Sequence, residues 1–215
     1  MAYKILNLYA CLGGNRYLWD EVADIEVTAV EWDSELVRLY KERFPNDTVI
    51  EADAHQYLLD HYKEFDFIWS SPPCPTHSKL NSSNRNKIKL KYPDMKLYQE
   101  IIFLKTWFKK KYCVENVIPY YQPLIPAKKR DRHLYWTNFN LPTNLSNRRS
   151  KDWARIKNEM QEWIVFHDYD FTKYKGQQPK RKIARNLVDY EAGKTILQTA
   201  LNAYESNNVE QQKLF

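Results

Sequence analysis

A proline-rich turn presents one of the three cysteines of the chain. Cys74 lies in the run Ser71-Pro72-Pro73-Cys74-Pro75, where prolines on both sides restrict the backbone. A cysteine that only packs in a core needs no such neighbours, so we expect an exposed and rigidly presented thiol. A thiolate is a nucleophile, and covalent attack divides one difficult reaction into easier steps. The turn therefore predicts a nucleophilic cysteine, whereas Cys113 lies in an apolar run and is expected to be buried.

A second group of residues predicts a nucleoside site. Gly13 and Gly14 make up half of the four glycines in the chain, and glycine lets a backbone approach a ligand closely. Glu31 follows them by roughly 20 residues, the spacing at which a carboxylate binds ribose hydroxyls in dinucleotide-binding folds. Trp32 could stack on a purine, and Asp53 could accept a hydrogen bond from an adenine amine. A tight turn without a ligand is the alternative for the two glycines taken alone.

The first half of the chain alternates short apolar runs with amphipathic segments. We expect strands over residues 3–9, 26–32, 48–51, 65–70 and 112–117, with helices over 15–22, 34–44, 54–62 and 93–108 between them. Such alternation predicts an α/β fold with a doubly wound, mostly parallel sheet. Ligands bind beyond the carboxyl ends of the strands in these sheets. Because neighbouring strand ends converge there, we expect Glu115 to emerge beside Cys74.

The second half of the chain is less regular. We expect a strand over residues 130–138, a helix over 150–166, irregular structure over 169–182 and a last helix over 189–204. The residues after this helix are polar and are expected to fray.

Four motifs together resemble the DNA (cytosine-5)-methyltransferase family, in a compact form. They are Pro72-Pro73-Cys74, Glu115-Asn116-Val117, Arg130-Asp131-Arg132 and Asn186-Leu187-Val188, in the family's order. The resemblance covers about residues 4–138 and 184–204. It implies the S-adenosylmethionine-dependent methyltransferase (Rossmann-like) fold and methyl transfer to carbon 5 of a flipped-out cytosine in DNA.

The resemblance also implies a role for each motif. Cys74 would add to carbon 6 of the base, and Glu115 would bond ring nitrogen 3 and the exocyclic amine. Arg132 would brace the base or Glu115, and Arg130 would support it or contact a phosphate. The base that removes the carbon-5 proton is left unassigned, and a water chain is one possibility. The residues expected to bind S-adenosylmethionine are Tyr9, Cys11, Gly13, Gly14, Glu31, Trp32, Asp53, Pro72, Asn186 and Val188.

Three departures from the family's pattern bear on the prediction. Cys11 stands where the family has the first glycine of its cofactor turn, and Arg185 replaces the glycine before Asn186. Family members also carry a sizeable target-recognition domain, for which only residues 139–183 remain here. We therefore expect a catalytic domain over 1–138 and 184–205, a short target-recognition segment over 139–183 and a flexible tail over 206–215.

The basic charge of the chain is concentrated in one stretch. The net charge is +6 and the isoelectric point about 9.0. Ten lysines and arginines between Lys79 and Lys111 face two acidic residues, a local +8, so the rest of the chain sums to −2. We expect residues 76–96 to form a loop that closes over a nucleic-acid strand, the alternative being a solvated surface loop. The expected DNA contacts are Ser78, Lys79, Arg85, Lys87, Lys89, Arg148, Arg149, Lys180 and Arg181.

Composition excludes several other classes of protein. A chain of 215 residues with 43% hydrophobic and 28% charged residues fits one globular domain. Three cysteines do not suggest a disulfide scaffold, and no apolar run reaches the length of a membrane span. The histidines show no metal-ligand spacing with the cysteines, so no metal is expected. We expect a cytoplasmic monomer, although a partner for target recognition is possible.

Three other functions compete with this prediction. An amino-methyltransferase would carry an aromatic residue at the position of Cys74. A cytosine-5 methyltransferase acting on RNA is a closer rival. A catalytically idle nucleic-acid binder, or a subunit that needs a partner, is the third.

Overall fold

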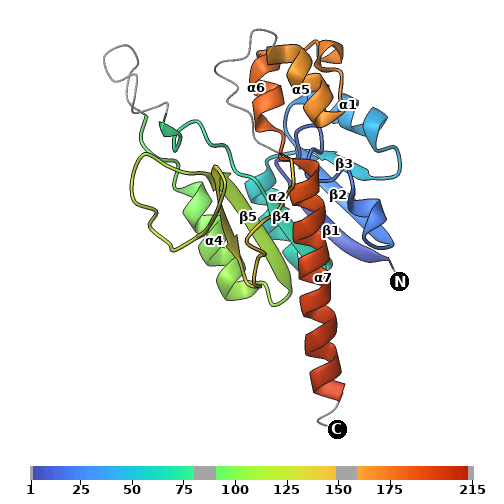
Figure 1. The fold of residues 1–215 in the computed structure, drawn as a ribbon, viewed down its shortest axis with the longest axis vertical. Helices are drawn as coiled ribbons and strands as arrows, with labels where there is room; N and C mark the ends of the chain where they lie inside the picture. Colours follow the sequence, from blue (N-terminus) through green and yellow to red (C-terminus); the bar gives the residue numbers. More distant parts are fainter. Residues whose placement is uncertain (1, 80–90, 149–158, 213–215) are drawn as a thin grey trace.

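The computed structural model describes residues 2–79, 91–148 and 159–212, and its centre is one seven-stranded sheet (Figure 1). The strand order is β3-β2-β1-β4-β5-β7-β6. The first five strands in this order are parallel, and β7 and β6 run antiparallel at one edge. The sheet confirms the predicted α/β class. The strands are β1 (Tyr3–Leu8), β2 (Ile25–Glu31), β3 (Thr48–Glu51), β4 (Phe67–Ser70), β5 (Lys111–Val117), β6 (Lys128–Arg130) and β7 (His133–Thr137).

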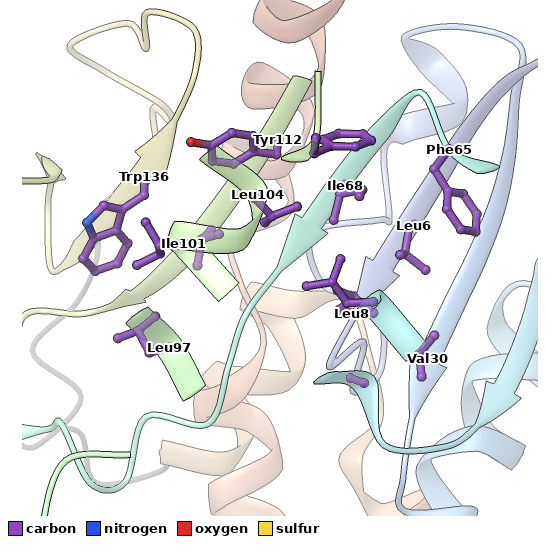
Figure 2. Packing of buried hydrophobic residues seen from close by; sticks show 14 of the residues in the cluster. Leu6, Leu8, Val30, Phe65, Ile68, Leu97, Ile101, Leu104, Tyr112 and Trp136 are labelled. Atoms are coloured by element: carbon purple, nitrogen blue, oxygen red, sulfur yellow. The ribbon is translucent and has the colours of Figure 1, made fainter. Parts of the chain in front are cut away.

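Helices cover both faces of the sheet because alternate strand residues point to opposite faces. Leu6 and Leu8 of β1 pack with α2 (Ala54–His61) and α4 (Lys96–Trp107), as Figure 2 shows for this cluster. Ile5 of the same strand packs on the other face, against the apolar side of α7 (Tyr190–Gln212). The short 3₁₀ helix η2 (Tyr62–Glu64) follows α2. The sheet is therefore the middle layer of three, and its strand ends are held from both sides.

Two segments differ from the sequence expectation in the first 138 residues. Residues 15–22 form turns and the 3₁₀ helix η1 (Trp19–Glu21) rather than an α-helix, because Trp19 is buried and its indole N–H donates to the carbonyl of Gly193 at 3.1 Å. The predicted strand over residues 130–138 is a hairpin of β6 and β7. Its turn contains Asp131 at φ 47°, a left-handed conformation that breaks a strand.

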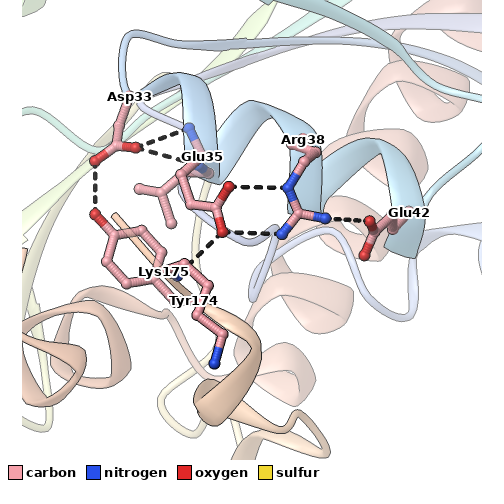
Figure 3. Close-up of polar contacts among 7 residues, drawn as sticks. Asp33, Glu35, Arg38, Glu42, Tyr174 and Lys175 are labelled. Atoms are coloured by element: carbon pink, nitrogen blue, oxygen red, sulfur yellow. Dashed lines mark hydrogen bonds and ion pairs between the residues drawn. The ribbon is translucent and has the colours of Figure 1, made fainter. Parts of the chain in front are cut away.

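A small helical layer lies on α1 (Ser34–Arg43) and is built from the second half of the chain. It contains α5 (Glu159–His167), η4 (Phe171–Lys173) and α6 (Lys180–Asn186). Polar bonds tie it to α1, as Figure 3 shows: the Tyr174 hydroxyl donates to Asp33 at 2.9 Å, and the backbone N–H of Lys175 donates to Glu35 at 3.0 Å. Irregular structure was expected over residues 169–182, but this range contains η4 and the first turn of α6. Helix α7 continues to Gln212, beyond the helix end expected at residue 204.

The amino-terminal glycine turn and α7 meet at a contact that excludes a side chain. A Cβ on Gly193 would lie 2.2 Å from the carbonyl oxygen of Asn15. Asn15 in turn donates from Nδ2 to Oδ1 of Asn7, a buried β1 residue, at 2.8 Å. The last helix is therefore locked against the turn that follows the first strand.

Candidate active site

The turn that follows β4 presents Cys74 at the carboxyl edge of the sheet. The carbonyl of Pro72 accepts a hydrogen bond from Nδ2 of Asn116 at 2.9 Å, which ties this turn to β5. The backbone N–H groups of His77 and Ser78 both donate to the carbonyl of Cys74 at 3.0 Å, so the chain beyond the cysteine forms a tight turn. Cys74 is partly exposed, whereas Cys11 and Cys113 are buried. Of the three thiols, Cys74 is therefore the one that can meet a substrate.

The thiol of Cys74 is protonated near neutral pH in this structure. Burial, and then the negative charge of Glu115, raise its pKa to about 11, and the charge of Lys182 acts in the opposite direction. The influence of Glu115 follows from the sheet, where Ser70 of β4 pairs with Val114 of β5. The β4–β5 ladder ends at this pair, so Ser71 leaves β4 beside Glu115, which continues β5. The predicted neighbourhood of Glu115 and Cys74 is thus present, and the thiol must lose its proton when it attacks.

The carboxyl of Glu115 is 9% exposed and faces a histidine that the sequence reasoning did not single out. Nε2 of His133 lies 3.6 Å from Oε1 of Glu115. Strands β5 and β7 pair Val117 with His133 and Glu115 with Tyr135, so Glu115 and His133 are diagonal neighbours. The signal was present, because His133 directly follows the Arg-x-Arg motif.

The two arginines of the Arg-x-Arg motif do not contact Glu115 in the described part of the chain. Arg130 donates to the backbone carbonyls of Lys129 at 2.8 Å, Leu141 at 2.9 Å and Pro142. It therefore anchors the chain that leaves β7. Arg132 is exposed in the turn between β6 and β7. The expected contact of Arg132 with Glu115 is not formed here, because the tight turn at Asp131 places the motif across a hairpin rather than along one strand. The alternative, that Arg132 braces the base, stays a prediction.

The predicted cofactor turn follows β1 and has a strained backbone. Tyr9, Cys11 and Gly13 have φ values of 57°, 49° and 65°. A Cβ on Gly13 would lie 2.5 Å from the ring of Phe44, so only glycine fits there. Val188 packs against the same turn, since a Cβ on Gly14 would lie 2.5 Å from its carbonyl oxygen.

Glu31 connects this turn to the end of β2. Its Oε2 accepts from the backbone N–H of Cys11 at 2.9 Å, and its Oε1 accepts from Trp32 at 2.9 Å and Asp33 at 3.1 Å. Burial raises the pKa of Glu31, and these three hydrogen bonds act against the rise. A carboxylate has about four acceptor positions, so one remains on Oε2 for a ribose hydroxyl. Trp32 is 78% exposed beside it and offers a ring for stacking. This chemistry fits the adenosine part of S-adenosylmethionine.

The remaining cofactor candidates lie along the same edge with different surroundings. Asp53 accepts from the N–H of Gln56 at 3.0 Å as the amino-terminal cap of α2, and lies 3.5 Å from the ammonium of Lys96. Its predicted bond to adenine would compete with these contacts. Asn186 is the exposed last residue of α6. Pro72 is buried in the cysteine turn.

A buried carboxylate behind the cofactor turn was missed by the sequence reasoning. Glu100 of α4 is fully buried and accepts from the hydroxyls of Tyr9 and Ser70, both at 2.6 Å. Nδ1 of His55 lies 3.0 Å from the same carboxylate, and this hydrogen bond raises the pKa of His55. A glutamate on the apolar stripe between Leu97 and Leu104 was the available signal, because unpaired charge on a core face is costly.

The predicted DNA contacts divide into three groups. Arg85, Lys87, Lys89 and Arg149 lie outside the described residues. Arg148 pairs with Asp189 at 2.9 Å and lies 3.8 Å from the ring centres of Phe166 and Tyr190, so a phosphate would have to compete with these contacts. The other described candidates are Ser78 and Lys79 in the segment after Cys74, and Lys180 and Arg181 at the exposed start of α6, where Arg181 pairs with Glu159.

Two kinds of feature are not found among the described residues. No group of histidine, cysteine and acidic side chains there could hold a metal ion. No helix over those ranges combines the length and apolar character that crossing a membrane requires.

Solved structures resemble the chain in part. They include DNMT2 of Spodoptera frugiperda, in a triple mutant (27% identity, 54% of this chain and 36% of that one, TM-score 0.41). Another is described as a DNA modification methyltransferase encoded within an Escherichia coli prophage. It has 17% identity over 56% of this chain and 34% of that one, and a TM-score of 0.39. A third is a methyltransferase of Entamoeba histolytica, with 12% identity over 54% of this chain and 38% of that one and a TM-score of 0.36. The chain spans little more than a third of the length of these proteins. No curated protein matches it.

One family model covers more than half of the chain. Residues 3–119 match the model of the C-5 cytosine-specific DNA methylases. The matched range runs from β1 past Glu115 and includes the cofactor turn, Glu31 and the Cys74 turn. The chain therefore belongs to the C-5 cytosine-specific DNA methylase family, whose cofactor is S-adenosylmethionine.

Proposed function

We propose that this chain methylates carbon 5 of a flipped-out cytosine in DNA, through a covalent adduct on Cys74. One observation supports this most directly. Asn116 bonds the carbonyl of Pro72 at 2.9 Å, so the nucleophile turn and the strand of Glu115 are fastened together at one sheet edge. The family description supports DNA as the substrate.

The proposed reaction begins with addition. Sγ of Cys74 bonds to carbon 6 of the cytosine, and its proton leaves as the bond forms, because a thiol with a pKa of about 11 is almost wholly protonated at rest. Negative charge then develops on ring nitrogen 3. Glu115 in its acid form would donate a proton there, and one well-placed donor of this kind lowers the barrier by about 3 kcal/mol.

S-adenosylmethionine, when bound, supplies the sulfonium methyl group that carbon 5 attacks. Glu31 and Trp32 would hold its ribose and adenine, and the turn over residues 9–14 would hold its methionine end. The carbon-5 proton then leaves and the bond from carbon 6 to Sγ breaks, which regenerates Cys74. The target atom is inaccessible within a duplex, so the base must rotate out at a cost of a few kcal/mol.

We propose that the second half of the chain recognises the target. The proposed short target-recognition segment spans residues 139–183, and its described part includes α5, η4 and the start of α6. The charge of Lys182 in α6 acts on Cys74, so the small helical layer reaches the same edge as the nucleophile. Lys180 and Arg181 on the adjacent turn of α6 would contact the DNA backbone.

Covalent trapping tests the proposed function. A duplex with 5-fluorocytosine at the target should accept the methyl group but cannot lose the carbon-5 substituent, so an adduct should survive denaturing electrophoresis. It should accumulate only with S-adenosylmethionine. The Cys74→Ser variant should form none, because a hydroxyl is far less ionised than a thiol. Trapping that persists in Cys74→Ser and vanishes in Cys113→Ser would overturn the assignment.

The substrate is tested with labelled methyl groups. The chain alone is incubated with labelled S-adenosylmethionine and either DNA or RNA, and bisulfite sequencing maps the modified cytosines. Label in DNA supports the proposal. Label in RNA alone would replace DNA by RNA as the substrate, and no label in either would favour an idle binder or a subunit that requires a partner.

A further inference from the structure

Among the described residues, the carboxyl of Glu115 has one side-chain partner at ion-pair distance, His133. Nε2 of His133 lies 3.6 Å from its Oε1. Glu115 is 9% exposed and His133 is 36% exposed, so the carboxyl is shielded while the imidazole reaches solvent. His133 thus lies between a buried acid and water.

The sheet holds these two side chains in register. His133 begins β7 opposite Val117, two residues beyond Glu115 on β5, and both pairs belong to one antiparallel ladder. The His133 ring also lies edge-on to Tyr135, with 6.5 Å between ring centres. The arginines on either side do not compete for the carboxyl, since Arg130 is bonded to backbone carbonyls and Arg132 is exposed in the turn.

The proposed reaction requires Glu115 to carry a proton in each cycle. An acid that is nearly excluded from water exchanges its proton slowly unless a neighbour carries it. The 3.6 Å between Nε2 of His133 and Oε1 of Glu115 is too long for a direct hydrogen bond. When a substrate binds, the two atoms can move into hydrogen-bond distance or be bridged by one water.

We propose that His133 carries protons between solvent and Glu115; this rests on the proposed function. The imidazolium of His133 gives its Nε2 proton to the Glu115 carboxylate, and water returns a proton to the imidazole. The acid O–H bond of Glu115 breaks as ring nitrogen 3 accepts that proton during addition of Cys74. When the bond between carbon 6 and sulfur breaks, the proton on ring nitrogen 3 returns to solvent through Glu115 and His133. His133 therefore gains and loses no net proton over the cycle.

Other titratable and charged groups surround the pair and must be held constant in the test. The charge of Glu115 raises the pKa values of Cys74, Cys113 and Tyr135 in addition to their burial. Charged groups on the elements that pack against the pair are Lys128 and Arg130 on β6, Asp131 and Arg132 in the turn, Lys182 on α6, and Asp189 before α7. The variants below leave all of them unchanged.

Two variants of His133 separate proton transfer from positioning. In His133→Gln the amide can still bond Glu115 but cannot ionise, so the single-turnover rate of methyl transfer should fall by about 100-fold, within the range of general acid–base catalysis. In His133→Ala, added imidazole should restore the rate, because the position is open to solvent.

His61 provides the matched control, since it pairs with Glu64 at 2.8 Å on the exposed end of α2. His61→Gln and His61→Ala should keep the wild-type rate and should not respond to imidazole. Thermal melting confirms that each variant is folded. A His133→Gln variant as fast as wild type, or a slow His133→Ala variant that imidazole leaves slow, would overturn the inference alone. A wild-type chain that transfers no methyl group to DNA or RNA would remove both the inference and the proposed function.

Discussion

Asn116 donates from Nδ2 to the carbonyl oxygen of Pro72 at 2.9 Å, while its own Oδ1 accepts from the N–H of Val117 at 2.9 Å. One buried side chain thereby links the backbone of β5 to the backbone two residues before Cys74. This amide therefore fastens the turn that carries Cys74 to the strand that carries Glu115. This explains a role for asparagine in Glu-Asn-Val that no property of the motif alone reveals.

Removal of this link should reduce activity more than stability. Asn116→Ala should cost about 1–2 kcal/mol of unfolding free energy, the usual value of a lost buried hydrogen bond. Methyl transfer should fall by about 100-fold, because small misplacement of reacting groups is costly. Asn138→Ala is the matched control, since Asn138 links Lys110 and Tyr112 at the opposite end of β5. Urea titration and single-turnover assays measure both effects; equal activity of the two variants would contradict the prediction.

The reactivity of Cys74 should depend on pH in a specific way. Its pKa is raised to about 11, so alkylation by iodoacetamide should be slow at pH 7.5 and increase up to about pH 11. Removal of the neighbouring negative charge in Glu115→Gln should move the midpoint to lower pH. Mass spectrometry of the folded protein identifies the labelled residue. Cys11 and Cys113 are buried and serve as internal controls, and a midpoint near the ordinary thiol value would argue against the burial of Cys74.

Binding of the cofactor should depend on Glu31. Glu31→Ala should weaken the affinity for S-adenosylmethionine about tenfold, or about 1.4 kcal/mol. Glu51 lies opposite Glu31 in the β2–β3 ladder and is exposed, so Glu51→Ala is the control. Calorimetry measures both affinities, with a melting curve to show that the Glu31 variant is folded. An unchanged affinity would remove Glu31 from the cofactor site.

Nucleic-acid binding should respond to charges on α6. Changing both Lys180 and Lys182 to glutamine should weaken binding to every DNA sequence alike and reduce the slope of log affinity against log salt by about 2 units. Lys105 in the last turn of α4 and Lys109 just after this helix are exposed and form the control pair. Fluorescence anisotropy across a salt series gives the slopes. An unaltered slope with a new sequence preference would mean that the α6 lysines do not contact phosphates.

The contact between Gly193 and Asn15 should decide the stability of the last helix. Alanine is a better helix former than glycine by about 1 kcal/mol, so local propensity alone would stabilise Gly193→Ala. A Cβ 2.2 Å from the Asn15 carbonyl forces the backbones apart, and we expect a net loss of about 2–3 kcal/mol. Asn202→Ala, on an exposed position of α7, should instead gain a few tenths of a kcal/mol. A Gly193→Ala variant more stable than wild type would show that the Asn15 backbone can move away from the added Cβ at little cost.

The α/β class of the fold follows from the sequence pattern alone, whereas the reacting groups stay predictions. The run over 112–117 predicts a strand because both faces of the sheet are buried there, and the strand ends then predict Cys74, Glu115 and Glu31 at one edge. The prediction was wrong where tertiary contacts outweigh local pattern. Residues 15–22 look amphipathic, yet burial of Trp19 shapes them into turns.

Which side chains surround the predicted reacting groups depends on the tertiary structure. Arg132 was the expected support for Glu115, but a left-handed residue, Asp131, turns the chain and places His133 there instead. Glu100 likewise joins the hydroxyls of Tyr9 and Ser70 across three elements. Such partners are far apart in sequence, and their contact depends on the packing of side chains within a few tenths of an ångström. Periodicity carries no information at that scale, because it records only which face of an element is apolar.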